Sequence, residues 1–409
     1  MVTIAPFKAL RPEPQLAKSI ASRPYDVLNS KEAKVEARGN PYSFLHITKS
    51  EIDLPNGVDI HSQEVYDKAK ENLQAFMSRK FLFQESKPCY YLYRIIMEGR
   101  AQTGLVCVSS VKDYENGLIK KHEFTRPEKE KDRIDHMGTI MAQTGNVFLT
   151  YRNVKELDDV ISKWTTEKNP QYDFIADDGI QHSVWIVNDD VIINQISHLF
   201  STKVPATYIA DGHHRAASAS KVKASLGNNA PEGAGYFLTT LFPDNQLAIM
   251  DYNRVVTDLC GLQEDEFLSR VSEKFDIEKS PTPVKPSSLH SFGLYLNKQW
   301  YSLKSKPGTW SADPIGVLDT TIAQENIFDP ILHIKDQRTD KRIDFVGGIR
   351  GLAELEKRVD SGEMAVAVSF YPVSMDQLLT IADSGNVMPP KSTWFEPKLR
   401  DGLLTHLIE

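Results

Sequence analysis

Cysteine is scarce in this sequence, and its three residues lie far apart. Cys89, Cys107 and Cys260 are odd in number and form no CxxC pair. This pattern excludes a disulfide framework and a structural zinc site with the usual cysteine spacing. Unpaired thiols of this kind suit a reducing compartment, so we expect a cytoplasmic protein.

Long apolar runs are absent as well. No stretch approaches the roughly 18 apolar residues of a membrane-spanning helix, and residues 1–10 contain no apolar core of signal-peptide length. We therefore expect neither a membrane partner nor export. Internal repeats and low-complexity blocks are also lacking, which excludes a solenoid or a fibrous chain.

The sequence also lacks an excess of positive charge. The 48 lysines and arginines against 55 aspartates and glutamates give a formal net charge of −7. Nucleic-acid affinity depends on lysine and arginine that displace counterions, so nucleic acid is not an expected partner. With 41% hydrophobic and 25% charged residues the composition is globular, and 409 residues suggest two or three compact units.

The most informative stretch that is present is 204–220, VPATYIADGHHRAASAS. Residues 204–210 are apolar and partly β-branched, which predicts a buried strand, and residues 214–226 are rich in helix formers. A strand that turns sharply into a helix directs the helix's first N–H groups, and the positive end of its dipole, at one point. Such a point binds anions.

The five residues at this turn carry the predicted chemistry. Gly212 lets a ligand approach the backbone, and Arg215 offers a forked cation for phosphate or carboxylate. His213 and His214 change charge near neutral pH. Asp211 either caps the helix or holds a cation such as Mg²⁺. Ordinary helix capping is the alternative, but two histidines and an arginine in succession favour an anion site.

A second charged stretch is 118–141, LIKKHEFTRPEKEKDRIDHMGTIM. Pro127 interrupts a helix here, so Lys121, His122 and Glu123 are expected at a strand end that faces a cleft. Glu123 would accept a proton from a hydroxyl substrate, with His122 beside it. Three cations of this stretch would balance phosphate charge: Lys121, Arg126 and Arg133. A solvated helix with salt bridges is the alternative.

Two further segments contribute candidates. Residues 23–27, RPYDV, form a rigid loop that presents Arg23, Tyr25 and Asp26 to a cleft as substrate-binding residues. The C-terminal residues 386–404 contain two adjacent aromatic side chains, so we expect this tail to dock on the body of the protein. Lys391 would then reach the same anion as Arg215, although docking for structural reasons alone is equally compatible with the pattern.

The order of elements favours an α+β fold with mixed, largely antiparallel sheets and helices packed on them. Residues 88–97 with 102–111, and 233–241 with 246–250, are expected to form hairpins, and hairpin strands are antiparallel. Residues 41–47 are expected to form a strand. We place one region at 1–260, with the DGHHR segment, and another at 261–409, whose tail returns to the body.

The quoted residues resemble known families. Asp211-Gly212-His213-His214-Arg215 after a strand is similar to the DGHHR-type motif of the ParB/sulfiredoxin-like superfamily, which includes free-serine kinases. Together with residues 23–27, 121–123 and 388–395 (MPPKSTWF), it makes nearly the whole chain similar to domain-of-unknown-function family 1015, DUF1015. The superfamily resemblance implies a ParB/sulfiredoxin-like core with large additions and a motif that contacts nucleotide phosphates.

The function that this resemblance implies is phosphoryl transfer from ATP or ADP to a hydroxy amino acid such as serine, with Mg²⁺ as the metal. The expected catalytic residues are Glu123, His122, Asp211, His213 and His214. The long insert between Glu123 and Asp211 departs from the kinase pattern. Two alternatives stay open, a phosphatase of a small phosphoester such as phosphoserine and a non-catalytic nucleotide-binding regulatory protein. Assembly as a homo-oligomer is left open too.

Overall fold

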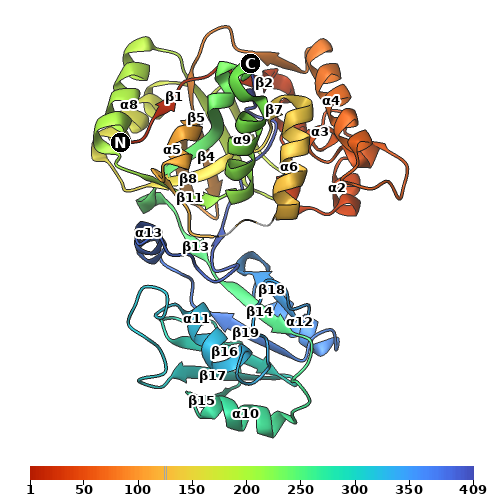
Figure 1. Ribbon diagram of the computed structural model, residues 1–409, viewed down its shortest axis with the longest axis vertical. Coiled ribbons are helices and arrows are strands. Elements are labelled where there is room, and N and C mark those ends of the chain that lie inside the picture. The colour runs from red at the N-terminus through yellow and green to blue at the C-terminus, as the bar shows by residue number, and fades with distance from the viewer. Residues whose placement is uncertain (124, 126) are drawn as a thin grey trace. The chain divides into compact units, whose positions relative to one another are not determined.

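The computed structural model describes residues 1–123, 125 and 127–409. The chain divides into two compact units, which Figure 1 shows coloured along the chain. Unit 1 contains Met1–Lys121, Thr125–Leu247 and Pro397–Glu409, whereas unit 2 contains His122, Glu123 and Ala248–Glu396. The division thus falls between residues 247 and 248, whereas the sequence placed it between 260 and 261. The last residues of the chain belong to unit 1.

In the described part of the chain, unit 1 is built on one nine-stranded sheet. Its strands follow the order β6-β11-β8-β12-β5-β4-β10-β9, and β1 pairs with β5. β11 runs parallel to β6 and β12 parallel to β8, while the other described pairs are antiparallel. The strands are β1 Ile4–Ala5, β4 Tyr90–Met97, β5 Arg100–Ser110, β6 Ile119–Lys120, β8 Val147–Tyr151, β9 Tyr172–Ile175, β10 Gln181–Val187, β11 Thr207–Asp211 and β12 Tyr236–Pro243.

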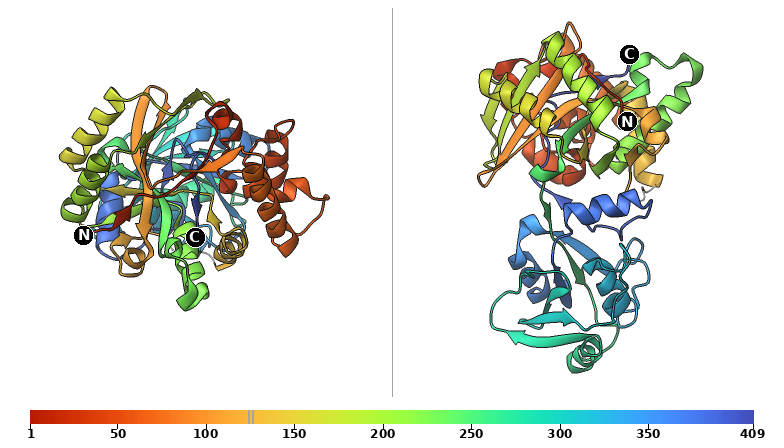
Figure 2. Two further views of the ribbon diagram at one scale, coloured as in Figure 1. Left: turned by 90° about the horizontal axis from the view of Figure 1, so that it is seen from above. Right: turned by 90° about the vertical axis from the view of Figure 1, so that its left-hand side faces the viewer.

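Helices surround this sheet. They are α1 Ala17–Ile20, α2 Ser30–Glu36, α3 Leu45–Thr48, α4 Gln63–Ser78, α5 Val111–Glu115, α6 Pro127–Ile140, α7 Lys155–Glu167, α8 Asp190–Lys203 and α9 His213–Leu226. α6 and α9 pack side by side (Figure 1). Small residues such as Ala216, Ser218 and Ala219 face inward on α9, so its backbone comes close to its neighbours. In the left view of Figure 2, α2–α4 and α7–α8 occupy opposite flanks of the unit.

Short strand pairs tie distant segments of unit 1 together. β2 Leu10–Pro12 pairs with β3 Leu82–Gln84, and β21 His406–Leu407 pairs with β7 Ala142–Gln143. The second pair fastens the C-terminal segment beside the residues that follow α6. Leu399, Leu403 and Leu404 are buried there, which explains why this terminus is ordered.

Unit 2 has its own core and its own antiparallel sheet, in the order β15-β17-β16-β19-β14-β18. Fully buried aromatic residues, Phe267, Phe275 and Phe292, fill the space between the sheet and its helices. The strands are β13 Ile249–Met250, β14 Tyr252–Val256, β15 Phe275–Ser280, β16 Ser291–Leu296, β17 Gln299–Ser305, β18 Ile343–Gly347, β19 Val366–Phe370 and β20 Trp394–Phe395. The helices are α10 Glu264–Ser272, α11 Asp319–Ala323, α12 Leu352–Asp360 and α13 Met375–Asp383.

The α+β class with largely antiparallel sheets is confirmed, and so is the β4–β5 hairpin. Two local predictions are wrong. Residues 41–47 do not form a strand, because the Asn40 side chain accepts a hydrogen bond from Tyr42 N (3.1 Å) and the chain then enters α3. Residues 233–241 and 246–250 do not form a hairpin, because β12 pairs with β5 and β8 while β13 pairs with β20. In the described part of the chain, no helix combines the length and the apolarity that crossing a bilayer requires.

Candidate functional site

The sharp turn from β11 to α9 forms as the DGHHR segment predicts. Asp211 is the last residue of β11, and α9 begins at His213. Gly212 between them has φ +99°, a conformation that costs any residue with a Cβ atom about 1 kcal/mol or more. A Cβ atom here would also lie 3.3 Å from Val147 Cα and 3.4 Å from Arg215 Cζ. Glycine is therefore needed both for the turn and for the guanidinium packed over it.

Arg215 is the centre of the ion pairs at this turn. The side chain is buried, and its Nη2 donates to Asp26 Oδ2 (3.0 Å) and to Asp211 Oδ2 (3.3 Å). Its Nη1 donates to the carbonyl oxygen of Asn146. Burial lowers the pKa of Arg215, but Asp26 and Asp211 outweigh this and hold the pKa above its ordinary value. The guanidinium is thus a permanent cation whose charge is balanced inside unit 1.

Asp211 does not cap α9, since Gly212 occupies the N-cap position. It accepts from Arg215 instead, and Lys398 Nζ lies 3.7 Å from its Oδ2. The Asp211 side chain keeps a third of its surface exposed. Of the two roles that the sequence allowed, capping the helix is wrong, and holding a metal cation stays a prediction.

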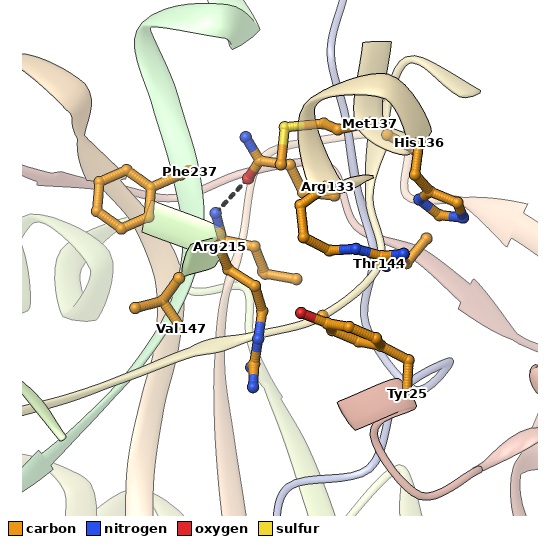
Figure 3. Close-up of a pocket in the computed structure, with 12 residues that line it drawn as sticks. Tyr25, Arg133, His136, Met137, Thr144, Val147, Arg215 and Phe237 are labelled. Carbon is orange, nitrogen blue, oxygen red and sulfur yellow. Dashed lines mark hydrogen bonds between the residues drawn. The ribbon is translucent and has the colours of Figure 1, made fainter. Parts of the chain in front are cut away.

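Tyr25 and Arg133 form the wall opposite Arg215. The guanidinium of Arg133 lies 3.9 Å from the centre of the Tyr25 ring, and its Nε and Nη2 donate to Asp132 Oδ2 (2.9 and 2.7 Å). Burial raises the pKa of Tyr25 to about 12, so the phenol stays neutral at physiological pH. Figure 3 shows the phenol directed toward Arg215, with Arg133 above the ring.

These side chains line a cavity of about 30 Å³ (Figure 3). Its wall includes Tyr25, Arg133, His136, Gln143, Thr144, Gly145 and Arg215. Such a volume admits water, whereas pockets for small-molecule ligands usually measure roughly 300–1,000 Å³. The cavity therefore cannot enclose a whole nucleotide.

The two histidines of the motif have different surroundings. His213 is buried, whereas His214 is half-buried and lies near Glu130. Lys221 and Thr125 donate to Glu130. Burial raises the pKa of Glu130, but these donors and His214 hold it below its ordinary value. At neutral pH a charged carboxylate therefore stands beside His214.

Several predicted site residues make other contacts. Arg23 pairs with Glu36 (2.5 Å), and Lys121 lies over the Tyr114 ring (3.9 Å). Burial lowers the pKa of Lys121. Lys391 belongs to unit 2, where its ammonium lies 5.7 Å from the centre of the Tyr252 ring.

His122 and Glu123 group with unit 2 as well. His122 is buried, its carbonyl accepts from Met388 N (2.9 Å), and its Nε2 lies 3.4 Å from Thr393 Oγ1. Glu123 is half-buried. Arg126 lies outside the described residues, so its predicted phosphate contact stays a prediction.

Three residues near Arg215 and Asp211 were not predicted from the sequence: Asn146, Lys398 and Asp401. Asn146 leads into β8, and nothing in its local pattern marks it as a contact of Arg215. Lys398 and Asp401 lie in the C-terminal tail, whose dense charged and aromatic side chains did indicate docking. No spacing rule connects residues so far apart along the chain, and only the folded sheet brings them together.

The magnesium ion that the sequence predicts at Asp211 stays a prediction. Mg²⁺ commonly binds one or two carboxylates together with substrate phosphates. Asp211 offers a partly exposed carboxylate at the end of a strand, beside the start of a helix. Asp211 would hold the ion, which would neutralise phosphate charge when it is bound.

Comparisons with solved structures give distant similarities. A conserved hypothetical protein from Pyrococcus furiosus is 12% identical, with a TM-score of 0.36, over 73% of this chain and 93% of that one. A free serine kinase in complex with AMP is 10% identical, with a TM-score of 0.37, over 73% and 91%. SbnI with a C-terminal truncation, from Staphylococcus aureus, is 8% identical, with a TM-score of 0.38, over 72% and 85%.

Among curated proteins no match is found. The family comparison gives a match over residues 4–321, which is most of the chain and includes both β11 and the start of α9. The C-terminal segment with Lys398 and Asp401 lies beyond the matched residues. On this match, the chain belongs to the family described as "Protein of unknown function (DUF1015)".

Proposed function

We propose that this protein binds the phosphates of ATP or ADP at the β11–α9 turn and transfers a phosphoryl group to a hydroxy amino acid such as serine. One observation carries the proposal. A glycine with positive φ starts the helix, and around it converge the cations of Arg215 and Lys398 and the partly exposed carboxylates of Asp26 and Asp211.

Phosphate binding follows from the local charges. The start of a 14-residue helix attracts anions, because its peptide dipoles align there. Lys398 adds an ammonium 3.7 Å from Asp211 Oδ2. Arg215 adds a fixed cation, which is held in place by its carboxylate partners and acts mainly through its field. Phosphoryl transfer depends largely on such positioning and charge neutralisation.

The proposed transfer forms one bond to phosphorus and breaks another. The substrate hydroxyl oxygen forms a bond to the terminal phosphorus, and the bond from that phosphorus to the leaving nucleotide oxygen breaks. The hydroxyl proton passes to Glu123, the base that the sequence predicts. Mg²⁺ held by Asp211 would neutralise charge on the phosphates. The exposed part of Asp26 suits the ammonium group of an amino acid.

The first experiment follows a labelled phosphate. Purified protein is incubated with Mg²⁺, with ATP or ADP labelled on the terminal phosphate, and with a pool of hydroxy amino acids. A labelled phosphoamino acid supports the proposal. Release of inorganic phosphate from phosphoserine would indicate a phosphatase with His213 or His214 as the catalytic group. Nucleotide binding without either product would indicate a regulatory protein.

Variants then test the residues. Asp211→Asn and Lys398→Ala should each lower transfer at least tenfold, and Glu123→Ala should stop transfer but leave nucleotide binding intact. Asp340→Asn is the matched control, because it breaks the Arg342–Asp340 pair (2.8 Å) in unit 2. Transfer that survives all three site substitutions would place the active site elsewhere.

A further inference from the structure

Asp401 is a buried carboxyl group that the C-terminal segment brings to the Arg215 site. Only 2% of its surface is exposed. Two backbone hydrogen bonds to Ser22 hold it, with Asp401 N donating to Ser22 O (2.9 Å) and Ser22 N donating to Asp401 O (3.1 Å). Hydrogen bonds thus hold the backbone of Asp401 in place without an ion pair.

Several charged and titratable groups face this carboxyl group. They are Arg215 from α9, Arg133 from α6, Tyr93 from β4, and Asp26 in the Tyr25–Val27 turn, while Tyr25 donates its backbone N–H to the carboxylate. A methyl group at Gly145 would lie 3.6 Å from Asp401 Oδ1 and 3.2 Å from Arg215 Cδ, so both side chains pack against this glycine.

Two polar atoms at this contact lack partners. Among the described residues, Asp401 Oδ2 and Arg215 Nε make no hydrogen bond, although both are buried. Buried polar atoms without partners are uncommon, and a functional role is one explanation for them. Arg215 therefore stands among three carboxyl groups, Asp26, Asp211 and Asp401, but bonds directly to two of them.

The charge of Asp401 changes in the physiological pH range. Burial raises its pKa to about 7, and Asp26 adds to the rise, while Arg215 and Arg133 oppose it. When Asp401 is neutral, two carboxylates, those of Asp26 and Asp211, balance the charge of Arg215. An ionised Asp401 adds a third negative charge beside the same guanidinium.

We propose that Asp401 is a positioning residue of the phosphate site, which acts on the bound anion through Arg215. The inference rests on the proposed function. When Asp401 is ionised, its negative charge offsets part of the positive potential of Arg215, and this weakens the binding of an anion at the β11–α9 turn. When it is neutral, Arg215 stabilises that anion more strongly. Asp401 itself touches no substrate.

The test is a pH profile of ADP binding without metal. Titration calorimetry is run at pH 6 and pH 8 on the wild-type protein, on Asp401→Asn and on Asp319→Asn. Asp319 is the matched control, because it is equally buried, lies in unit 2, and also has its pKa raised by burial to about 7. Sulfate is used as a competitor, since its charge does not change over this range.

Wild-type protein and Asp319→Asn should lose about fivefold to tenfold in affinity between pH 6 and pH 8, as one extra charge several ångströms from the anion predicts. Asp401→Asn should keep its pH 6 affinity. Equal pH profiles for all three proteins would overturn the inference while leaving the proposed function standing. Failure of every protein to bind ADP would overturn both.

A thermal midpoint for each protein shows whether it folds. If Asp401→Asn does not fold, the pH dependence of sulfate competition is measured on the wild-type protein instead. Asp401→Glu is then the second variant. An inflection near pH 7 that Asp401→Glu shifts supports the inference. A flat wild-type sulfate profile contradicts it.

Discussion

Arg215 forms two ion pairs, with Asp26 and Asp211, although its charged motif looks exposed in the sequence. Replacing it by alanine leaves Asp26 and Asp211 without their main cation and removes the bond to the Asn146 carbonyl. We expect Arg215→Ala to destabilise unit 1 by about 3 kcal/mol, as for other broken buried pairs. The control is Arg338→Ala, whose half-exposed pair with Asp336 should contribute about 1 kcal/mol or less. Denaturant unfolding measures both, and equal losses would contradict the central place of Arg215.

Replacing Gly212 should have two energetic costs, one for its backbone conformation and one for steric crowding. Gly212→Ala should lose about 1 kcal/mol for its φ of +99° and more for crowding against Val147 and Arg215. Gly385→Ala has a similar φ of +73° with no atom near its Cβ position, so it should show only the conformational cost. Thermal midpoints compare them. If the two variants lose equal stability, Gly212 serves the turn alone.

Asp319 gives unit 2 a pH dependence of known sign. Burial raises its pKa to about 7, above the ordinary value of 3.8. The folded state therefore binds the proton more tightly than the unfolded state, and stability is lost as pH rises from 4 through 7. Asp319→Asn should remove this loss, of at most about 1.4 kcal/mol per pH unit. The thermal midpoint of the variant relative to wild type should thus rise from pH 5 to pH 8, and a constant difference would contradict the assignment.

For single residues, the sequence was informative where the interacting residues lie close together in the chain. Asp211, Gly212 and Arg215 are adjacent, so the turn and its charges could be predicted together. Arg23 and Lys391 could not be placed, because their partners, Glu36 and the Tyr252 ring, are chosen by packing. Asp401 could not be found at all, since a carboxyl group in a C-terminal tail gives no sign that it will be buried beside Arg215.

Among the elements, the C-terminal segment matters most to unit 1. Leu403, Leu404 and Ile408 are buried, and β21 pairs with β7. Removing residues 397–409 should expose their apolar neighbours at about 2 kcal/mol or more per side chain, enough to unfold a typical unit. Circular dichroism and proteolysis of the truncated protein test this. Leu404→Ala should be costly and Leu289→Ala, at an exposed position, nearly neutral.

Elements with strong local signals were predictable, and those chosen by distant pairing were not. The β4–β5 hairpin follows from two β-rich runs around Gly99, which has positive φ. The short run at 41–47 was predicted as a strand, but it follows the turn at Asn40 and its last three residues belong to α3. β13 was assigned to the wrong partner because β20 lies far along the chain.

In the whole molecule, each unit has its own buried core. We therefore predict two transitions in differential scanning calorimetry. Arg215→Ala should lower one midpoint and Phe267→Ala, in the core of unit 2, the other. A single transition that both variants shift equally would contradict this. The α+β class was predictable from hairpins and helices, and the adjacent aromatic residues of the tail predicted that it docks, whereas the division at residue 247 depends on tertiary contacts.

The central claim is that the β11–α9 turn binds nucleotide phosphate. A crystal structure of the protein soaked with ADP and Mg²⁺ tests it most directly. We predict phosphate oxygens within hydrogen-bond distance of the backbone N–H groups of His213 and His214, with Lys398 turned toward them and the metal on Asp211. ADP bound at any other place in unit 1 or unit 2, with this turn unchanged, would contradict the account.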